Sequence, residues 1–258
     1  MIQIDALAKV SAMREGGQKL GVILQDLLSF SQVGVTLLDI DARADRLIQE
    51  AGGTASFKTV RGYRWATCLC VNEVVVHGVP TQYKLQNGDV FTIDIGMLYK
   101  GFHTDTAWTK IIENDELRIK NYEEKNKFLD VGKTALWKAI GQARIGNHVG
   151  HISKAIEEGV VGAGYSIVKS LVGHGVGSKL HEDPQIPGFL RGKTSDTPKL
   201  EAGMTIAIEV IYAQGSGEVS YDHLDGWTVA TRDHSLTAVF EHTVATQASG
   251  PLVLTKVD

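Results

Sequence analysis

The chain has 258 residues, a formal net charge of −4 and 43% hydrophobic residues. This composition is typical of a folded globular protein, and it excludes an intrinsically disordered chain or a strongly basic nucleic-acid-binding protein. No apolar stretch approaches the roughly 20 residues that cross a bilayer, and residues 1–5 lead into a helical pattern in place of a secretion signal. We therefore expect a cytoplasmic protein with no membrane segment and no direct nucleic-acid partner.

Hydrophobic spacing predicts an α+β protein. Helical periodicity covers residues 5–30 and 36–51, and β-rich segments continue from there to residue 110. Helices are predicted again over 114–143 and 148–162, before a second set of strands. Both the segment from Gly34 to Gly52 and the segment from Gly146 to Gly164 begin and end with glycine and carry a helix. This repetition indicates two halves related by a pseudo-two-fold axis, within one domain that spans residues 1–258.

Two predicted strands carry aspartates in apolar surroundings, Asp94 and Asp105. If Tyr99 and Lys100 form a two-residue hairpin loop, the aspartates lie directly opposite each other, with Cβ atoms roughly 5 Å apart. Two such charges repel by about 4 kcal/mol at an effective dielectric constant of ~20. The pattern therefore favours a divalent cation beside them.

Two glutamates, Glu209 and Glu241, stand where core strands usually carry apolar residues. His174 lies in a glycine-rich loop that permits close approach of a ligand. Taken singly, each acid fits a solvated surface position, and the histidine fits a hydrogen-bonded core position. Together with Asp94 and Asp105, however, they give four carboxylates and one neutral imidazole, a charge that two divalent ions would balance. The five residues predict a dinuclear metal site.

Cys68 and Cys70 are the only cysteines, and they alternate along one predicted strand. Neighbouring positions of one strand do not form an ordinary disulfide, and two thiols do not make a zinc site. We expect both to be buried or pocket-lining thiols.

The motifs around these residues resemble those of type I methionine aminopeptidases of the pita-bread metallopeptidase superfamily. The matching segments occur in the family's order and spacing over nearly the whole chain: 71–80, 93–94 with Asp105, 173–177, 181–184, 203–209, 225–229 and 241–243. The resemblance implies a pita-bread fold with pseudo-two-fold related halves. It also implies metal-dependent removal of the initiator methionine from peptides and nascent proteins with a small second residue.

For the metal site, the resemblance assigns a role to each ligand. Asp94 would bind one metal, Asp105 and Glu241 would bridge both metals, and His174 with Glu209 would complete the second. A metal-bridging water would be the nucleophile, with Glu209 as its general base. The oxygen-rich set suits Mn(II), Fe(II) or Co(II), with Zn(II) also acceptable.

For the substrate, the resemblance assigns His77 to a hydrogen bond near the scissile amide. His181 would polarise the scissile carbonyl or steady the tetrahedral intermediate. Together with these two histidines, the residues implied to bind substrate are Phe57, Tyr63, Cys68 and Trp227.

The family also carries a monovalent-cation site, built largely from backbone carbonyls, which would fall near Asn72, Val74 and Thr237. The implied partners are the N-termini of nascent polypeptides, met at the ribosome, and we expect the protein to act as a monomer.

Five positions depart from the family pattern, and none of them is a predicted metal ligand: Phe57, Val60, Leu180, Val210 and Val239. Phe57 and Val60 stand where a cysteine and a tyrosine are common, and Leu180 replaces a common phenylalanine. These departures leave the shape of the methionine pocket open.

Three alternatives stay open. Aminopeptidase P and prolidase, which cleave beside proline, share the five-ligand core but normally carry an additional N-terminal domain. Type II methionine aminopeptidases usually insert a helical subdomain between the second catalytic histidine and the next glutamate ligand, whereas His181 and Glu209 are only 28 residues apart. A non-catalytic pita-bread binding module typically lacks ligands that are all present here.

Overall fold

The computed structural model describes residues 6–114, 120–222 and 224–256. Its helices are α1 (Ala6–Phe30), α2 (Leu37–Glu50), α3 (Tyr122–Ile140) and α4 (Val149–Val161), with short 3₁₀ turns η1 (Ser56–Thr59) and η2 (Thr194–Asp196). Its strands are β1 (Thr54–Ala55), β2 (Thr67–Val71), β3 (Val74–Val76), β4 (Val90–Tyr99), β5 (Phe102–Ile111), β6 (Ser166–Ile167), β7 (Val172–Gly175), β8 (Glu182–Pro187), β9 (Thr205–Ala213), β10 (Val219–Tyr221), β11 (Val229–Thr231), β12 (Thr237–Gln247) and β13 (Gly250–Val253).

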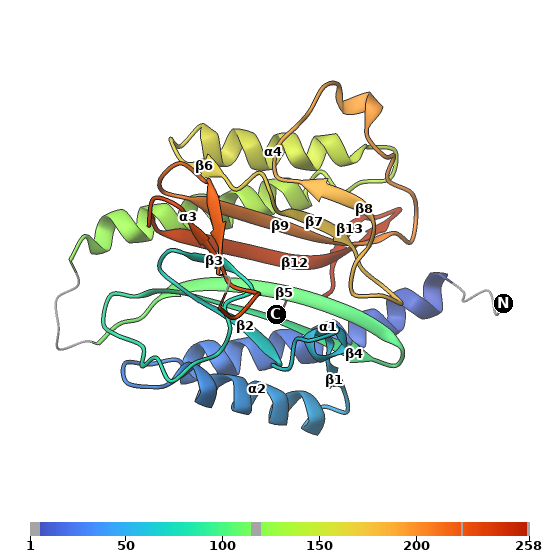
Figure 1. Ribbon diagram of the computed structural model, residues 1–258. Coiled ribbons are helices and arrows are strands. Elements are labelled where there is room, and N and C mark those ends of the chain that lie inside the picture. Colours follow the sequence, from blue (N-terminus) through green and yellow to red (C-terminus); the bar gives the residue numbers. More distant parts are fainter. Residues whose placement is uncertain (1–5, 115–119, 223, 257–258) are drawn as a thin grey trace.

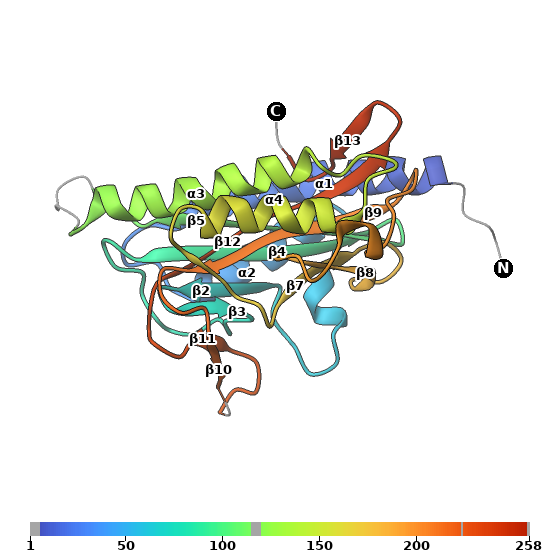
Figure 2. The same cartoon turned by 90° about the horizontal axis from the view of Figure 1, so that it is seen from above.

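A ten-stranded antiparallel sheet forms the centre of the molecule. Its main path runs β1-β4-β5-β12-β9-β7-β8, while β2 pairs with β4, β6 with β9 and β13 with β12. A second sheet of three strands has the order β10-β11-β3. Figure 2 shows α1, α3 and α4 along one side of the main sheet and the small sheet on the other side.

Each pair of helices packs on its own half of the sheet (Figure 1). The helices α1 and α2 share a core with β2 and β4, whereas α3 and α4 share one with β9 and β12. In α1 the buried residues Leu20, Ile23, Leu24 and Leu27 recur at three- and four-residue spacing, which places them on one helix face. Burial of each such side chain contributes about 1.5–3 kcal/mol. No helix in the described part of the chain is long and apolar enough to cross a membrane.

The glycine repetition marks equivalent turns in the two halves. Gly34 and Gly146, which precede α2 and α4, have φ angles of 89° and 90°. Gly52 and Gly164, which follow the same helices, have φ angles of 81° and 88°. These are left-handed conformations that favour glycine. The predicted relation between the segments is confirmed in backbone geometry, although their side chains differ.

The predicted register of the β4–β5 hairpin is wrong by two residues. Tyr99 pairs with Phe102, so Lys100 and Gly101 form the loop, and Asp94 lies opposite Ala107. The φ angles of Lys100 and Gly101 are 50° and 84°, as required at both central positions of a type I′ turn. Because Gly101 readily adopts the positive φ that the second loop position requires, the loop is Lys100–Gly101 and not Tyr99–Lys100. Asp105 still shares a face with Asp94, but as a diagonal neighbour.

The helix predicted over 114–143 is shorter. It begins at Tyr122 and ends at Ile140. Residues 115–119 of the predicted range lie outside the described residues. Asn121, directly before the helix, has a left-handed φ of 58°, which is incompatible with an earlier helical start through that residue.

The matched glycines allow a test of the pseudo-symmetry. A Cβ at Gly34 or Gly146 would meet no heavy atom within 4 Å, so alanine there adds backbone strain without a clash. We expect Gly34→Ala and Gly146→Ala each to lower the free energy of unfolding by about 1–2 kcal/mol, the cost of a left-handed L-residue. Urea unfolding of the metal-free protein measures both. Gly132→Ala is the contrasting variant, because its Cβ would lie 2.6 Å from Phe240 and Tyr212. Unequal costs at positions 34 and 146 would contradict the equivalence.

Candidate metal centre

The four predicted acidic ligands, together called the row below, lie on one face of the neighbouring strands β4, β5, β12 and β9. Glu209 on β9 lies directly opposite Glu241 on β12, and Glu241 lies opposite Ala107 on β5. On the other side of Ala107 is Asp94 on β4, and Asp105 is two residues before Ala107. Because side chains alternate along a strand, all four carboxylates project from the same face. The directly facing pair of acids is therefore Glu209 with Glu241, where the sequence predicted Asp94 with Asp105.

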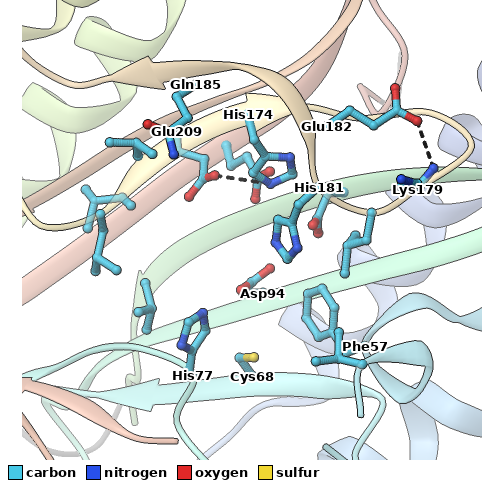
Figure 3. A pocket seen from close by; sticks show the side chains of 18 of the residues that line it. Phe57, Cys68, His77, Asp94, His174, Lys179, His181, Glu182, Gln185 and Glu209 are labelled. Carbon is cyan, nitrogen blue, oxygen red and sulfur yellow. Dashed lines mark hydrogen bonds and ion pairs between the residues drawn. The ribbon is translucent and has the colours of Figure 1, made fainter.

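His174 joins the row from β7, on the other side of β9, where it lies opposite Ala207 and so two positions along from Glu209. Its Nδ1 donates a hydrogen bond of 2.8 Å to the carbonyl of Gly175, so Nε2 keeps its lone pair. Nε2 lies 3.5 Å from Oε1 of Glu209, and Figure 3 shows these side chains turned toward each other. Ligand-type atoms of Asp105, His174 and Glu241 all lie within 4.8 Å of one another. The imidazole is oriented as a metal-binding histidine requires.

The surroundings favour the uncharged form of every one of these groups. Burial raises the pKa of Asp94 to about 7. Burial and the charges of Asp94 and Glu209 raise the pKa of Asp105 well above its usual value. Burial acts in the same direction on the pKa values of Glu209 and Glu241, and lowers the pKa of His174 to about 4. The His174–Glu209 contact is therefore not an ordinary salt bridge.

Two carboxylate oxygens of the row are buried without a hydrogen-bond partner among the described residues. They are Asp94 Oδ1 and Glu241 Oε1. Burial of a polar group without a partner lowers the free energy of unfolding by about 1–3 kcal/mol in mutational data. Hard oxygen donors with one imidazole and no thiolate suit divalent ions such as Mn(II), Fe(II) or Co(II). The residues present fit a divalent metal.

A cleft of about 920 Å³ opens over the row. One end is apolar, where Phe57, Tyr63, Cys68 and Leu180 form a buried cluster with Trp227 packed against it. The Tyr63 ring meets Trp227 edge-to-face at 5.1 Å between centroids. Tyr63 Oη also donates its one proton to the Thr67 carbonyl at 2.8 Å and lies 3.3 Å from Cys68 Sγ. This end is a pre-formed pocket for an apolar side chain.

The cysteines behave as expected. Both are free and buried, and only Cys68 lines the cleft. Burial raises the pKa of each thiol, that of Cys70 to about 12, so both are neutral near pH 7.

Two histidines flank the row at the cleft. Figure 3 shows His77 and His181 on either side of Asp94. His181 meets His174 edge-to-face, with 4.5 Å between ring centroids. His77 has a left-handed φ of 55°, an uncommon conformation for a non-glycine residue that clusters at functional sites. Burial in the cleft removes water from around both rings and lowers their pKa values, so both are neutral near pH 7.

Oxygens also gather at the positions expected for a monovalent cation. Thr237 Oγ1 lies 3.0 Å from the Asn72 carbonyl oxygen and 2.8 Å from the Val74 carbonyl oxygen, and its one proton is shared between them. Asn72 holds a left-handed φ of 56°.

Comparison with known proteins shows the family of this chain. Residues 11–248 match the model of metallopeptidase family M24. The chain belongs to this family. It is 38% identical to a methionine aminopeptidase of Clostridium perfringens and 37% identical to methionine aminopeptidase 1 of Bacillus subtilis, in each case over all of both chains.

Solved structures agree with this M24 membership. The crystal structure of methionine aminopeptidase from Thermotoga maritima matches all of both chains, with 34% identity and a TM-score of 0.91. A prolidase from Pyrococcus furiosus matches 97% of this chain and 64% of its own, with a TM-score of 0.74, but at 19% identity it shows the fold alone. The predicted α+β pita-bread fold is confirmed.

The departures from the family pattern separate into two groups. Phe57, Val60 and Leu180 line the cleft, as do all the residues predicted to bind substrate. Val210 instead packs in the core beneath α3 and α4, because it points to the face opposite Glu209. Val239 is buried against Val75, Val76 and Ile211. The pocket shape therefore depends on the first three positions.

Sequence reasoning missed four further apolar residues that line the cleft: Val76, Leu171, Val172 and Ile211. The signal for Ile211 was available, since it is two residues after Glu209 and so shares its face. Nothing in the sequence marked Leu171 or Val172, which approach through the fold.

The raised carboxyl pKa values predict how pH acts on the metal-free protein. Below its folded pKa of about 7, Asp94 holds a proton that the unfolded chain releases above about pH 4. The native state thus binds more protons in this window, and stability falls as pH rises from 5 to 7. We expect Asp94→Asn to remove part of this fall, measured by thermal unfolding in EDTA at both pH values. An identical pH response in the variant would show that Asp94 is already ionised at pH 5.

Proposed function

We propose that this chain is a methionine aminopeptidase that removes the N-terminal methionine from peptides and nascent proteins with a small second residue. The observation that carries the proposal is the row of Asp94, Asp105, His174, Glu209 and Glu241 directly beside an apolar pocket. The row supports hydrolysis, and the pocket supports selection of one apolar side chain. The full-length similarity to methionine aminopeptidases points to the same reaction.

We further propose that the row holds two divalent ions, with Mn(II), Fe(II) or Co(II) preferred, and a monovalent cation near Thr237. When bound, the divalent metals would supply an activated water at neutral pH and polarise the scissile carbonyl. Glu209 would accept the proton of the attacking water as general base. Its raised pKa in the metal-free protein falls when positive charge is close, which returns it to the basic form.

The cleft residues orient the substrate. The four carboxylates make the row attractive to a free α-amine, which favours chain ends over internal peptide bonds. Neutral His181 would donate a hydrogen bond to the oxyanion that develops on the scissile carbonyl, and His77 would hold the adjacent amide. The methionine side chain would enter between Tyr63, Cys68 and Trp227, where its flexible thioether adapts to an irregular apolar wall.

We propose the N-termini of nascent polypeptides as the protein partners, met at the ribosome in the cytoplasm, with the enzyme acting as a monomer and residues 1–258 as one catalytic domain. The second candidate is cleavage of Xaa-Pro bonds, which the prolidase-like fold allows. A non-catalytic binding module is less compatible with four buried carboxylates, because their burial is costly unless a cation is bound.

Substrate selectivity tests the proposal. We expect Met-Ala-Ser to have the highest kcat/KM, and norleucine-Ala-Ser to lie within roughly 10-fold, because an isosteric change in an apolar pocket is worth about 1–3 kcal/mol. Leu-Ala-Ser, Ala-Ala-Ser and an Xaa-Pro peptide are the comparisons, each with Mn(II), Fe(II), Co(II) and Zn(II). Preference for alanine or leucine would mean that Phe57 closes the pocket. Cleavage of the Xaa-Pro peptide alone would replace the proposed activity by the second candidate.

His181→Ala separates catalysis from metal binding. We expect kcat to fall by about 10²–10⁴, the range for a positioned acid–base or oxyanion group, with metal content unchanged. Steady-state kinetics and metal analysis of the purified variant measure both. A loss of metal with normal kcat per bound metal would instead identify His181 as a ligand.

A further inference from the structure

The two halves of the main sheet meet along a short seam between β5 and β12. Only two residue pairs are in register there, Ala107 with Glu241 and Thr106 with His242. By contrast, β4–β5 and β9–β12 are paired along nearly their whole lengths. The seam is therefore much shorter than the ladders on either side of it, although it joins the strands that carry Asp105 and Glu241.

At one end of the seam, a threonine hydroxyl takes the place of the backbone ladder. The amide of Asp105 donates to Thr243 Oγ1 at 2.9 Å, and Thr243 Oγ1 donates to the carbonyl of Asp105 at 2.7 Å. A hydroxyl has one proton to donate and two lone pairs, so it satisfies both backbone groups of Asp105 at once. Thr243 is fully buried and lies two residues after Glu241.

The same arrangement occurs at the other end. The amide of Val239 donates to Thr109 Oγ1 at 2.9 Å, and Thr109 Oγ1 donates to the carbonyl of Val239 at 2.8 Å. Thr109 lies two residues after Ala107, as Thr243 lies two residues after Glu241. The two threonines are thus counterparts under the pseudo-two-fold axis. They differ in what they hold, because Val239 is an apolar residue and Asp105 is a candidate ligand.

We propose that Thr243 is a positioning residue that sets the separation between Asp105 and Glu241, and with it the affinity of the row for divalent metal, whereas Thr109 only closes the seam. The inference rests on the proposed metal site. Inserting one hydroxyl between the strands fixes how far they diverge beyond the central pair. Asp105 on β5 and Glu241 on β12 belong to the two strands that this hydroxyl holds apart, and their candidate ligand atoms lie within 4.8 Å of each other.

The test is calorimetric titration of the metal-free protein with Mn(II) and with Co(II). We expect Thr243→Val to weaken metal binding by about 10-fold or more, the effect of removing a group that supports a metal ligand. Thr243→Ser keeps the hydroxyl and should bind as the parent protein does. Thr109→Val removes the equivalent bonds from the seam and should leave metal affinity within about 2-fold. Thr243→Ala serves as a second hydroxyl-free variant if valine does not fit.

Thermal unfolding of each metal-free variant separates positioning from stability. Thr109→Val should lose at least as much stability as Thr243→Val, because it also loses the 2.8 Å hydrogen bond between Thr92 Oγ1 and Thr109 Oγ1, but only Thr243→Val should lose affinity. Equal affinity losses in the two variants, or parental affinity in both hydroxyl-free variants at position 243, would overturn the proposal. Asp105→Ala tests the site itself: if it binds metal as the parent does, the metal site is wrong, and not merely the role of Thr243.

Discussion

The burial of acidic side chains is the constraint on which this structure depends. Four carboxylates share one face of a sheet, and no lysine or arginine among the described residues forms an ion pair with any of them. Desolvation and mutual repulsion act against this arrangement. In the absence of a bound cation, the packing of the rest of the sheet must compensate for this cost. Metal binding then returns free energy to the fold, by about 2.7 kcal/mol when free metal is 100 times its dissociation constant.

The sheet meets this demand by dividing its two faces. On β9, Ile206, Ile208, Val210 and Tyr212 belong to the core beneath α3 and α4. The alternate positions, with Glu209 and Ile211, face the cleft. The row also contains Ala107 and Ala207, whose small side chains leave space between larger ligand groups. One apolar face thus stabilises the strands so that the other can remain polar and poorly satisfied.

Much of this was predictable from sequence, because burial and charge conflict visibly at the ligands. An acid inside an apolar strand, such as Glu209 or Glu241, needs a partner when the strand is buried. The family-like motifs then indicated the fold and the reaction. The hairpin register was mispredicted, although Gly101 marked the loop position that requires a positive φ. The roles of Thr109 and Thr243 could not be predicted, since they depend on which strands meet at the seam.

The candidate ligands are divided between the two halves of the sheet. Asp94 and Asp105 come from the first half, whereas His174, Glu209 and Glu241 come from the second. Neither set alone can offer five donors to a cation. The complete set of candidate donors therefore exists only after both halves have formed and met across β5 and β12.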